Sequence, residues 1–469
     1  MRMSTGRLGL LDLALGAAVV VAIAVCGCGG GDAGESDATS PDVPGLDIPA
    51  DLGQELPPVA PGVPILDRTP DLRFDCQVTR GITNHTPLAW ARSAHPLVTT
   101  AAGQVFLARV QSSQPSPFEP GVPSMRVGPF LEDGTLGEAV EIPSVPDKVS
   151  GMAAIPAGEG FLLAWAQETV LTALRDGTGA PVAAAKTLSL PSGDYSTRPV
   201  LAAQDGGFAM AFSTPTAAGR AVQFTRLDAQ GAALGPAHEF PTQGESWGDP
   251  GVALAAGGGR WGLLWQEWKD GKSRVTFAAV DAAGALAVDR KVVSSSEDDD
   301  FGGMTAFSQP RLALIPVATG WIAAWTEARE GADFQSGASA LVRLARLDVD
   351  GNVMDRAPVR AAVVDRDEVE PILVPFQGAV GLFWSSGTHI YMCAGCTPDH
   401  TIQFVLLDPV TLAPLGAVQS IPPASGGLLG LSVTVDGDAL LLTTEIGFHV
   451  HQEPGSAALA CTALAGGAP

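Results

Sequence analysis

A short apolar phrase that ends in an aromatic residue recurs along this chain at steps of about fifty residues. It occurs five times with little change, as GFLLAW (160–165), GGFAMAF (206–212), RWGLLW (260–265), GWIAAW (320–325) and AVGLFW (379–384). The closing aromatic residues are 47, 53, 60 and 59 positions apart, a spacing typical of one four-stranded propeller blade with variable loops. Weaker copies at 103–110 and 437–444 bring the number of units to seven.

A second phrase follows the first in most units and predicts a β-hairpin. It is seen as LEDGTLG (131–137), LRDGTG (174–179), LDAQGAALG (227–235), VDAAGALA (280–287) and LDVDGNVMD (347–355). An aspartate near the start and a glycine three residues later suit a type I turn that is closed by a residue in the left-handed region. Short strands separated by Gly, Pro, Asp and Ser, without apolar recurrence at helical spacing, exclude the helical repeat families. The sequence therefore predicts an all-β fold, a β-propeller of seven four-stranded blades.

The two phrases together resemble a known group of proteins. GGFAMAF and TRLDAQGAALG, between residues 206 and 235, follow the pattern GGFxxAW…RLDxxGxxLG. In this pattern the chain is similar to the propeller-type repeat lipoproteins of bacterial surfaces, over roughly residues 95–469. The resemblance implies an architecture and a location at the cell surface, and it brings no reaction with it.

The first 28 residues follow the pattern of a bacterial export signal. Arg2 and Arg7 precede an uncharged run over residues 13–25, and small residues follow it. A run of this length is too short for a membrane-spanning helix, which needs about 20 apolar residues. We therefore expect a cleaved signal.

The end of this signal resembles the lipobox of bacterial lipoproteins, in which a cysteine after a small residue is acylated. Cys28 follows Gly27, whereas Cys26 follows the β-branched Val25. The resemblance implies that Cys28 carries the lipid. Because Gly29 stands where an aspartate would signal inner-membrane retention, it also implies the outer membrane or the cell surface. An ordinary secretory signal with incidental cysteines is the alternative.

The segment 29–63 is acidic and rich in Pro and Gly. It contains no Lys, Arg, Phe, Tyr or Trp, so it cannot bury enough apolar surface to offset the entropy of ordering. We expect a disordered tether at 29–63 between the signal peptide at 1–28 and a propeller domain at 64–469.

The net charge of the chain indicates which classes of partner to expect. The chain has 27 Lys and Arg against 50 Asp and Glu, a net charge of -23. A protein that neutralises phosphates needs clustered basic residues, and no basic cluster occurs in this sequence. A nucleic-acid partner is therefore not expected. The expected partners are the membrane, through the lipid, and a protein or glycan ligand.

Four cysteines remain after the signal, an even number that suggests two disulfides in an oxidising compartment. Cys393 and Cys396 can pair only locally, which leaves Cys76 and Cys461 at the two ends of the predicted propeller. The segment HIYMCAGCTPDH (389–400) also spaces two histidines and two cysteines in a way that could bind zinc. The disulfide is favoured over this zinc site because only one such cysteine pair is present.

Other clusters of possible metal ligands have simpler interpretations. Asp348, Asp350, Asn352 and Asp355 could suggest calcium, but their spacing departs from the EF-hand pattern and favours a plain hairpin turn. His449 and His451 would share one strand face without a visible third ligand. We expect no cofactor and no metal, and we assign no catalytic residue.

A ring of polar residues at one end of the channel is the predicted binding site. In several units a proline opens the strand that precedes the apolar phrase, and a proline is allowed at the first position of a strand. The residues before these prolines are equivalent and differ in chemistry, as suits the recognition of a polar ligand in a concave site. They are His95, Arg198, Asp249, Gln309 and Glu370. The simpler interpretation is that these residues are polar because they precede turn prolines and are solvated.

Two functions from different classes are compatible with the sequence. The first is a non-catalytic surface scaffold that binds a protein or glycan. The second is an extracellular carbohydrate-active hydrolase or lyase with acids such as Asp249 and Glu370 contributed by different blades. Two carboxylates within about 10 Å at the channel mouth would favour the second function.

The attachment prediction concerns one atom, the thiol sulfur of Cys28. We expect a Cys28→Ser variant to lose membrane attachment or to stall during processing, because no thiol remains for the acyl group. Membrane fractionation and mass spectrometry of the mature N-terminus measure both outcomes. A Cys26→Ser variant is the control, and loss of attachment in that variant alone would show that the other cysteine is acylated.

Overall fold

The computed structural model describes most of the chain from Arg73 to Leu464. The described residues are 66, 73–84, 96–112, 123–142, 149, 151–167, 169–191, 198–204, 207–216, 219–242, 251–269, 272–294, 312–328, 340–358, 367–387, 401–421, 428–448 and 451–464. The chain divides into two compact units, Met1–Gln54 and Glu55–Pro469, and all described residues belong to the second. The predicted signal peptide, Cys28 and the predicted tether at 29–63 lie outside the described residues.

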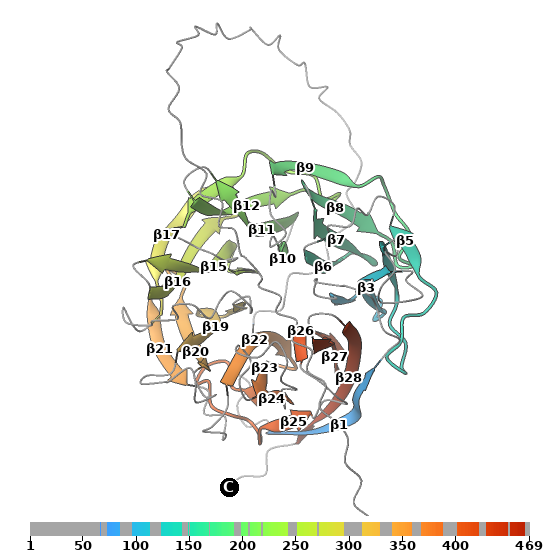
Figure 1. Ribbon diagram of the computed structural model, residues 1–469. Helices are drawn as coiled ribbons and strands as arrows, with labels where there is room; N and C mark the ends of the chain where they lie inside the picture. Colours follow the sequence, from blue (N-terminus) through green and yellow to red (C-terminus); the bar gives the residue numbers. More distant parts are fainter. Residues whose placement is uncertain are drawn as a thin grey trace, which may run out of the picture. The chain divides into compact units, whose positions relative to one another are not determined.

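Seven antiparallel sheets of four strands each form a ring, which confirms the predicted seven-bladed propeller (Figure 1). The innermost strands are β2 (Leu97–Thr99), β6 (Gly151–Ala157), β10 (Val200–Gln204), β14 (Val252–Gly257), β18 (Ala313–Val317), β22 (Asp367–Phe376) and β26 (Leu428–Asp436). The second strands are β3 (Val105–Ser112), β7 (Gly160–Ala166), β11 (Gly207–Thr216), β15 (Arg260–Lys269), β19 (Gly320–Ala328), β23 (Ala379–Gly387) and β27 (Ala439–Phe448).

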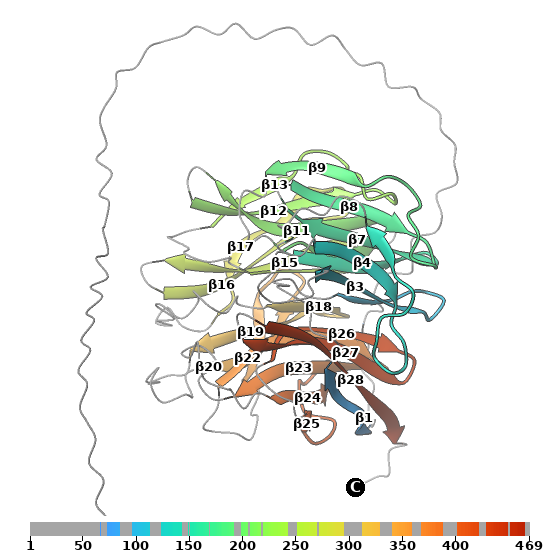
Figure 2. The ribbon, with the colours of Figure 1, turned by 45° about the vertical axis from the view of Figure 1, so that its right-hand side comes forward.

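The outer half of each blade completes the sheets. The third strands are β4 (Pro123–Pro129), β8 (Thr169–Arg175), β12 (Gly219–Leu227), β16 (Lys272–Asp281), β20 (Ala340–Asp348), β24 (Thr401–Leu407) and β28 (His451–Leu464). The outermost strands are β5 (Val140–Ile142), β9 (Lys186–Pro191), β13 (His238–Pro241), β17 (Leu286–Val292), β21 (Val353–Pro358), β25 (Gln419–Ile421) and, from the N-terminal side of the chain, β1 (Arg73–Asn84). We number the blades 1 to 7 from the blade of β2 to the blade of β26, and Figure 2 shows the sheets from a second angle.

The two faces of the ring differ because successive strands of a blade run in opposite directions. Each innermost strand starts on the face that we call the loop face, where the chain arrives from the preceding blade. It ends on the opposite face, the turn face, where tight turns such as 318–319 and 377–378 join it to the second strand. Most connections on the loop face are longer, and the longest run between β17 and β18.

The repeated apolar phrase forms the second strand of its blade. Its closing aromatic residue is buried in every copy, at Trp165, Phe212, Trp265, Trp325 and Trp384, each at most 1% exposed. Its leading glycine has a steric role. A Cβ at Gly160 or Gly320 would collide with the carbonyl oxygen of the third strand, at Arg175 or Leu347, so only glycine allows this close approach.

The hairpin phrase forms the turn between the third and outermost strands, as predicted. In blade 3 the Asp228 carboxylate accepts hydrogen bonds from the backbone N–H groups of Gln230 and Ala232, at 2.9 and 2.8 Å. Gly231 closes the turn at a φ of 82°. In blade 2 the hydrogen bond from the Thr178 hydroxyl is the main cause that lowers the pKa of Asp176 below its usual value. In each of these turns the aspartate carboxylate thus accepts hydrogen bonds from the backbone N–H groups of the same turn.

These turns also join one blade to the next. Thr172 of blade 2 donates a hydrogen bond to the Gly231 carbonyl of blade 3 at 2.7 Å. Arg226 of blade 3 donates to the Ala283 carbonyl of blade 4 at 2.6 Å, and Arg260 of blade 4 donates to the Val349 carbonyl of blade 5 at 2.8 Å. Each of these bonds ends on a carbonyl group of a turn in the next blade. The conformation of the turn therefore determines whether the contact between the two blades can form.

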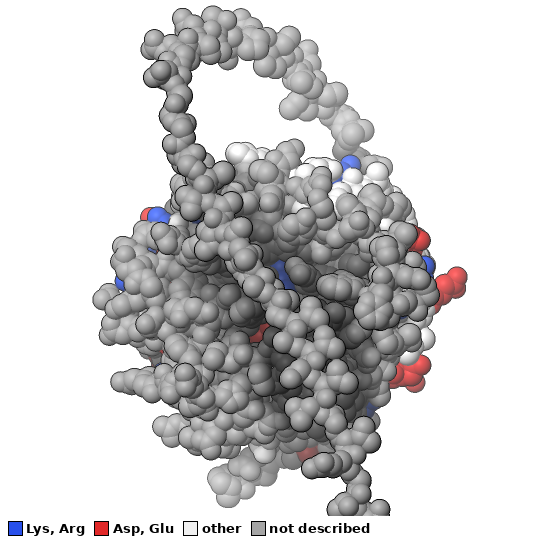
Figure 3. All heavy atoms as spheres, viewed as in Figure 1, with Lys and Arg blue, Asp and Glu red and all other residues white. Residues whose placement is uncertain are grey.

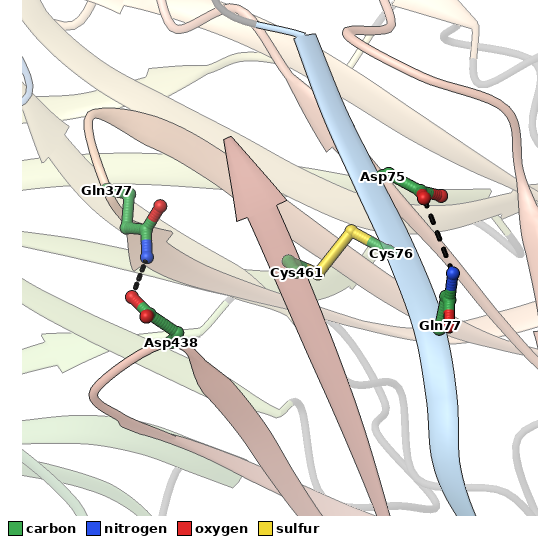
Figure 4. Close-up of a disulfide and its surroundings, with 6 residues drawn as sticks. All are labelled: Asp75, Cys76, Gln77, Gln377, Asp438 and Cys461. Carbon is green, nitrogen blue, oxygen red and sulfur yellow. Dashed lines mark hydrogen bonds between the residues drawn. A yellow bond between two sulfur atoms is a disulfide. The ribbon is translucent and has the colours of Figure 1, made fainter. Parts of the chain in front are cut away.

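The ring closes in blade 7, where β1 is the outermost strand beside β28. Cys76 and Cys461 face each other in register and form a disulfide, which confirms their predicted pairing. In Figure 4 the bond crosses directly between the two strands. Near it, Gln377 of blade 6 donates a hydrogen bond to Asp438 of blade 7 (Figure 4). The N-terminal strand and the last strand are therefore linked covalently.

The disulfide should contribute strongly to stability because 385 residues separate its two cysteines. Loop closure of this length gives at most about 5–6 kcal/mol in the chain-entropy model. We expect reductant to lower the Tm of the parent more than that of a Cys76→Ser/Cys461→Ser variant, which keeps only the predicted Cys393–Cys396 pair. Equal Tm values of the parent with and without reductant would contradict this stabilisation. Non-reducing peptide mapping of the same samples tests the predicted Cys393–Cys396 pair, which lies outside the described residues.

Candidate functional site

The seven innermost strands enclose the candidate site, a central cavity of about 400 Å³. Each of these strands, or the residues just before it, contributes to the lining, for example through Leu97, Ala153, Val200, Ala253, Ala313, Ile372 and Leu431. Each innermost strand has only one neighbour in its sheet. Its other edge therefore faces the channel with backbone N–H and C=O groups. The site combines apolar side chains with the polar edges of strands.

Arg198 provides the positive charge of the cavity. Among the lining residues that the structure describes, it carries the only charged side chain, and Ser432 carries the only other polar side chain. Arg198 lies two residues before β10 and is partly buried. Figure 3 shows Lys or Arg atoms and Asp or Glu atoms within the central hollow. A guanidinium in such a hollow suits an anionic or hydrogen-bond-accepting group of a ligand.

Gly151 determines how closely Arg198 approaches the neighbouring blade. Gly151 is the first residue of β6, and a Cβ at this position would lie 2.8 Å from both Cα and Cγ of Arg198. No side chain fits there without moving Arg198. The sequence gives no signal for this role, because the contact joins blade 2 to the segment before β10.

Glu370 is the most unusual residue near the mouth. Its φ is 57°, in the left-handed region that non-glycine residues rarely adopt. It lies at an irregularity of β22, where the register with β23 shifts between Val369 and Ile372. The residue is only 7% exposed, and the next residue, Pro371, lines the cavity. Strained backbone of this kind concentrates at functional sites.

The prolines that define the predicted ring occupy two kinds of position. Pro96 and Pro199 immediately precede β2 and β10, as expected, and both line the cavity. Pro371 instead lies inside β22, at the irregularity beside Glu370. The expectation that this proline opens a strand is therefore wrong. A bulge accommodates it because the bulged residue makes no ladder bond.

Two of the five predicted ring residues, Arg198 and Glu370, are described by the structure. The other three, His95, Asp249 and Gln309, lie outside the described residues, so the distance between the carboxylates of Asp249 and Glu370 is not defined. Cys393, Cys396 and the two histidines of the alternative zinc site also lie outside them, as does His449. The roles of these residues stay predictions.

The possible calcium loop at 348–355 is a hairpin turn. The Asp348 carboxylate accepts hydrogen bonds from the backbone N–H groups of Asp350 and Asn352, at 2.9 and 2.8 Å. The Lys291 ammonium donates to the Asp350 carbonyl and to the Asn352 side-chain oxygen, at 2.7 and 2.8 Å. Burial raises the pKa of Asp348, but hydrogen bonds from Asn352 and Asp350 outweigh it and lower the pKa overall. The Lys291 ammonium group thus supplies the positive charge beside this turn.

The described ranges contain neither a cluster of possible metal ligands nor a helix that could span a membrane. These ranges contain no group of three or more His, Cys, Asp or Glu side chains that could hold a metal ion. Within the same ranges no helix is long and apolar enough to cross a membrane.

Comparisons with known proteins add little beyond the fold. No protein-family model matches the sequence, and no curated protein matches it. Among solved structures, the chain is similar to a subtype N10 neuraminidase-like protein of A/little yellow-shouldered bat/Guatemala/060/2010, with 11% identity, 66% of this chain and 96% of that chain covered, and a TM-score of 0.37. It is also similar to a thermostable family-43 glycoside hydrolase, with 10% identity, 69% and 95% covered, and a TM-score of 0.34. Scores this low carry no argument about function, and the seven sheets themselves define this chain as a β-propeller.

The backbone strain at Glu370 can be measured with two substitutions that remove the same carboxylate. Glycine adopts a positive φ without steric cost, whereas alanine does not. We therefore expect Glu370→Gly to be more stable than Glu370→Ala by about 1 kcal/mol. Urea unfolding measures the difference. If the alanine variant is as stable as the glycine variant, Glu370 is not held in a strained conformation.

Proposed function

We propose that this protein is an exported, lipid-anchored β-propeller that binds a protein or glycan partner around the loop-face mouth of its channel without transforming it. The observation that carries this proposal is the composition of the cavity wall. All seven blades contribute to it, and its described lining is apolar except for Arg198 and Ser432. Apolar walls with few polar groups are typical of recognition sites.

The longer connections on the loop face support the same proposal. Binding residues are disproportionately found on loops that a rigid scaffold positions. In this chain the rigid part is the ring of blades, and the segments 295–311 and 388–400 are among the longer connections on the loop face. A partner that covers the mouth would therefore meet both the channel rim and these segments.

The location follows from the N-terminal sequence. We propose that the protein belongs to the propeller-type repeat lipoproteins of bacterial surfaces and is anchored through Cys28 in the outer membrane or at the cell surface. The tether at 29–63 is long enough to hold the propeller clear of the lipid headgroups, since a proline-rich chain extends by up to about 3.1 Å per residue.

One observation favours a second candidate, a carbohydrate-active hydrolase or lyase. Glu370 combines a buried carboxylate with a strained backbone next to a cavity-lining proline. Burial and strain together are typical of catalytic acids. In this candidate Asp249 would be the second carboxylate.

Binding is tested with the mature protein in detergent on a glycan array and in pull-downs from surface extracts. For a partner identified in this way, we expect Arg198→Ala to weaken binding at least about tenfold, the loss of one charge-assisted hydrogen bond or more. Arg290→Ala is the matched control, because Arg290 lies on the outermost strand β17.

Two results would contradict the proposal. Binding by Arg198→Ala and Glu370→Ala variants that is as tight as in the parent would place the site elsewhere. Release of shorter sugars from a bound glycan by the parent, lost in Glu370→Gln, would establish the hydrolase or lyase instead.

A further inference from the structure

Blade 1 departs from the repeat at the end of its apolar phrase. Its copy, GQVFLAR (103–109), ends in Arg109, where the five strong copies end in Trp or Phe. The equivalence follows from the strand pairing. Val105 and Phe161 both lie opposite the end of the third strand, and Arg109 and Trp165 stand four residues after them. A charged side chain thus occupies the place of a buried aromatic ring.

Arg109 faces a second arginine across the sheet. In the register of β3 and β4, Arg126 is directly opposite Arg109. Leu107 belongs to the core against which blade 7 packs, so Arg109, two residues further along the strand, points toward blade 7 as well. Met125 and Val127 belong to the core shared with blade 2, so Arg126 between them also points toward blade 7. Both arginines are partly buried.

Blade 5 has an arginine at the same position and neutralises it within the blade. Arg343 is opposite Trp325 in the register, and its guanidinium forms an ion pair with the carboxylate of Glu327, two residues after Trp325. In blade 1 the residue two positions after Arg109 is Gln111. Blade 5 therefore combines one arginine with one carboxylate, whereas blade 1 combines two arginines with a neutral residue.

Two like charges in directly opposite positions are unfavourable. The Cβ atoms of such a pair lie about 5 Å apart, and equal charges there destabilise the sheet. Burial is the main cause that lowers the pKa of Arg109, and the charge of Arg126 lowers it further. Among the described residues, the buried Nε of Arg126 has no hydrogen-bond partner. An anion between the two side chains would offset the repulsion and accept a hydrogen bond from this N–H group.

The acidic residues that the structure describes in blades 7 and 1 lie elsewhere. Those of blade 1 are exposed, and those of blade 7 are exposed or belong to the turn-face hairpin between β26 and β27. They are Glu132, Asp133, Glu138 and Glu141 in blade 1 and Asp75, Asp436 and Asp438 in blade 7. Glu141 is opposite Arg126 in the register of β4 and β5, but it is exposed at the outer edge of the blade.

We propose that Arg109 and Arg126 form a binding site for a tetrahedral oxyanion, a free phosphate or sulfate or the same group on a ligand, between blades 7 and 1. Each guanidinium presents a planar set of N–H donors that fits the oxygens of such a group. Phosphate carries close to two negative charges at pH 7, so one group offsets both arginines. Arg109 lies three residues before the loop-face end of β3, where the anion has access from solvent.

Calorimetric titration of the mature protein in detergent with inorganic phosphate tests the site. About 0.15 M NaCl screens exposed charges and suppresses unspecific attraction. We expect saturable binding of one phosphate to the parent and binding at least about tenfold weaker in Arg126→Gln, which loses a charge-assisted hydrogen bond. Arg290→Gln, exposed on β17, is the matched control and should bind like the parent. No saturable binding by the parent, or equal binding by Arg126→Gln, would overturn the proposal.

Thermal unfolding separates this site from an ion pair within the chain. In buffer without phosphate and sulfate we expect Arg126→Gln to have at least the Tm of the parent, because one of two like charges is gone. Phosphate should raise the Tm of the parent and leave that of the variant unchanged. A lower Tm of the variant in anion-free buffer, with no response of the parent to phosphate, would show that the chain itself neutralises the arginines. If Arg126→Gln does not fold, Arg126→Lys replaces it, since an ammonium group lacks the planar set of donors.

The source of the oxyanion is identified with two further probes, glucose 6-phosphate and glucose. Glucose 6-phosphate that binds more tightly than inorganic phosphate would assign the site to a ligand-borne group, and weaker binding would assign it to the free ion. Glucose that binds as tightly as glucose 6-phosphate would contradict recognition of the oxyanion. The inference concerns a blade interface and none of its tests uses a protein or glycan partner, so its failure leaves the proposed binding function unaffected.

Discussion

The whole ring depends on the packing of each second strand between two neighbouring blades. The aromatic residue at the end of the strand reaches the blade before its own. Trp165 of blade 2 lies in one core cluster with Val98 and Phe106 of blade 1, and the Trp265 ring of blade 4 lies 5.5 Å from the Phe240 ring of blade 3. Without this contact, the apolar faces of a four-stranded blade would be exposed to water. Such faces are stable only when they are buried against a neighbouring element. The apolar phrase therefore repeats in the sequence because every blade needs the same interface with its neighbour.

The interface between blades 7 and 1 closes the ring in a different way. Its core is formed mainly by Leu97, Val105, Leu107 and Phe130, with Leu441 from blade 7 packed against them. Polar contacts supplement this smaller core. The hydroxyls of Thr99 and Thr434 lie 2.8 Å apart, and the N–H of Leu97 donates to the Ser432 hydroxyl at 3.2 Å. Arg80 of β1 lies over the Phe130 ring at 5.6 Å. The disulfide secures the same blade, where the two ends of the chain meet.

Features that repeat could be predicted from the sequence, and features that occur once could not. The second strands, the capped turns and the pairing of Cys76 with Cys461 follow from spacing, turn chemistry and the closure of a ring. The irregularity at Glu370 occurs in one blade only, and a bulge depends on what its neighbours leave room for. The contact of Gly151 with Arg198 and the isolated bridge between Leu66 and Val317 join residues that are distant in sequence. No local pattern encodes such contacts, so both were found only in the structure.

The two faces of the ring differ in how regularly their contacts repeat from blade to blade. On the turn face, capped aspartates and hydrogen bonds between blades repeat from unit to unit, so substitutions there act on the ring as a whole. On the loop face the connections differ in length and sequence, and Arg198 and the strained Glu370 lie at the ends of the innermost strands nearest to it.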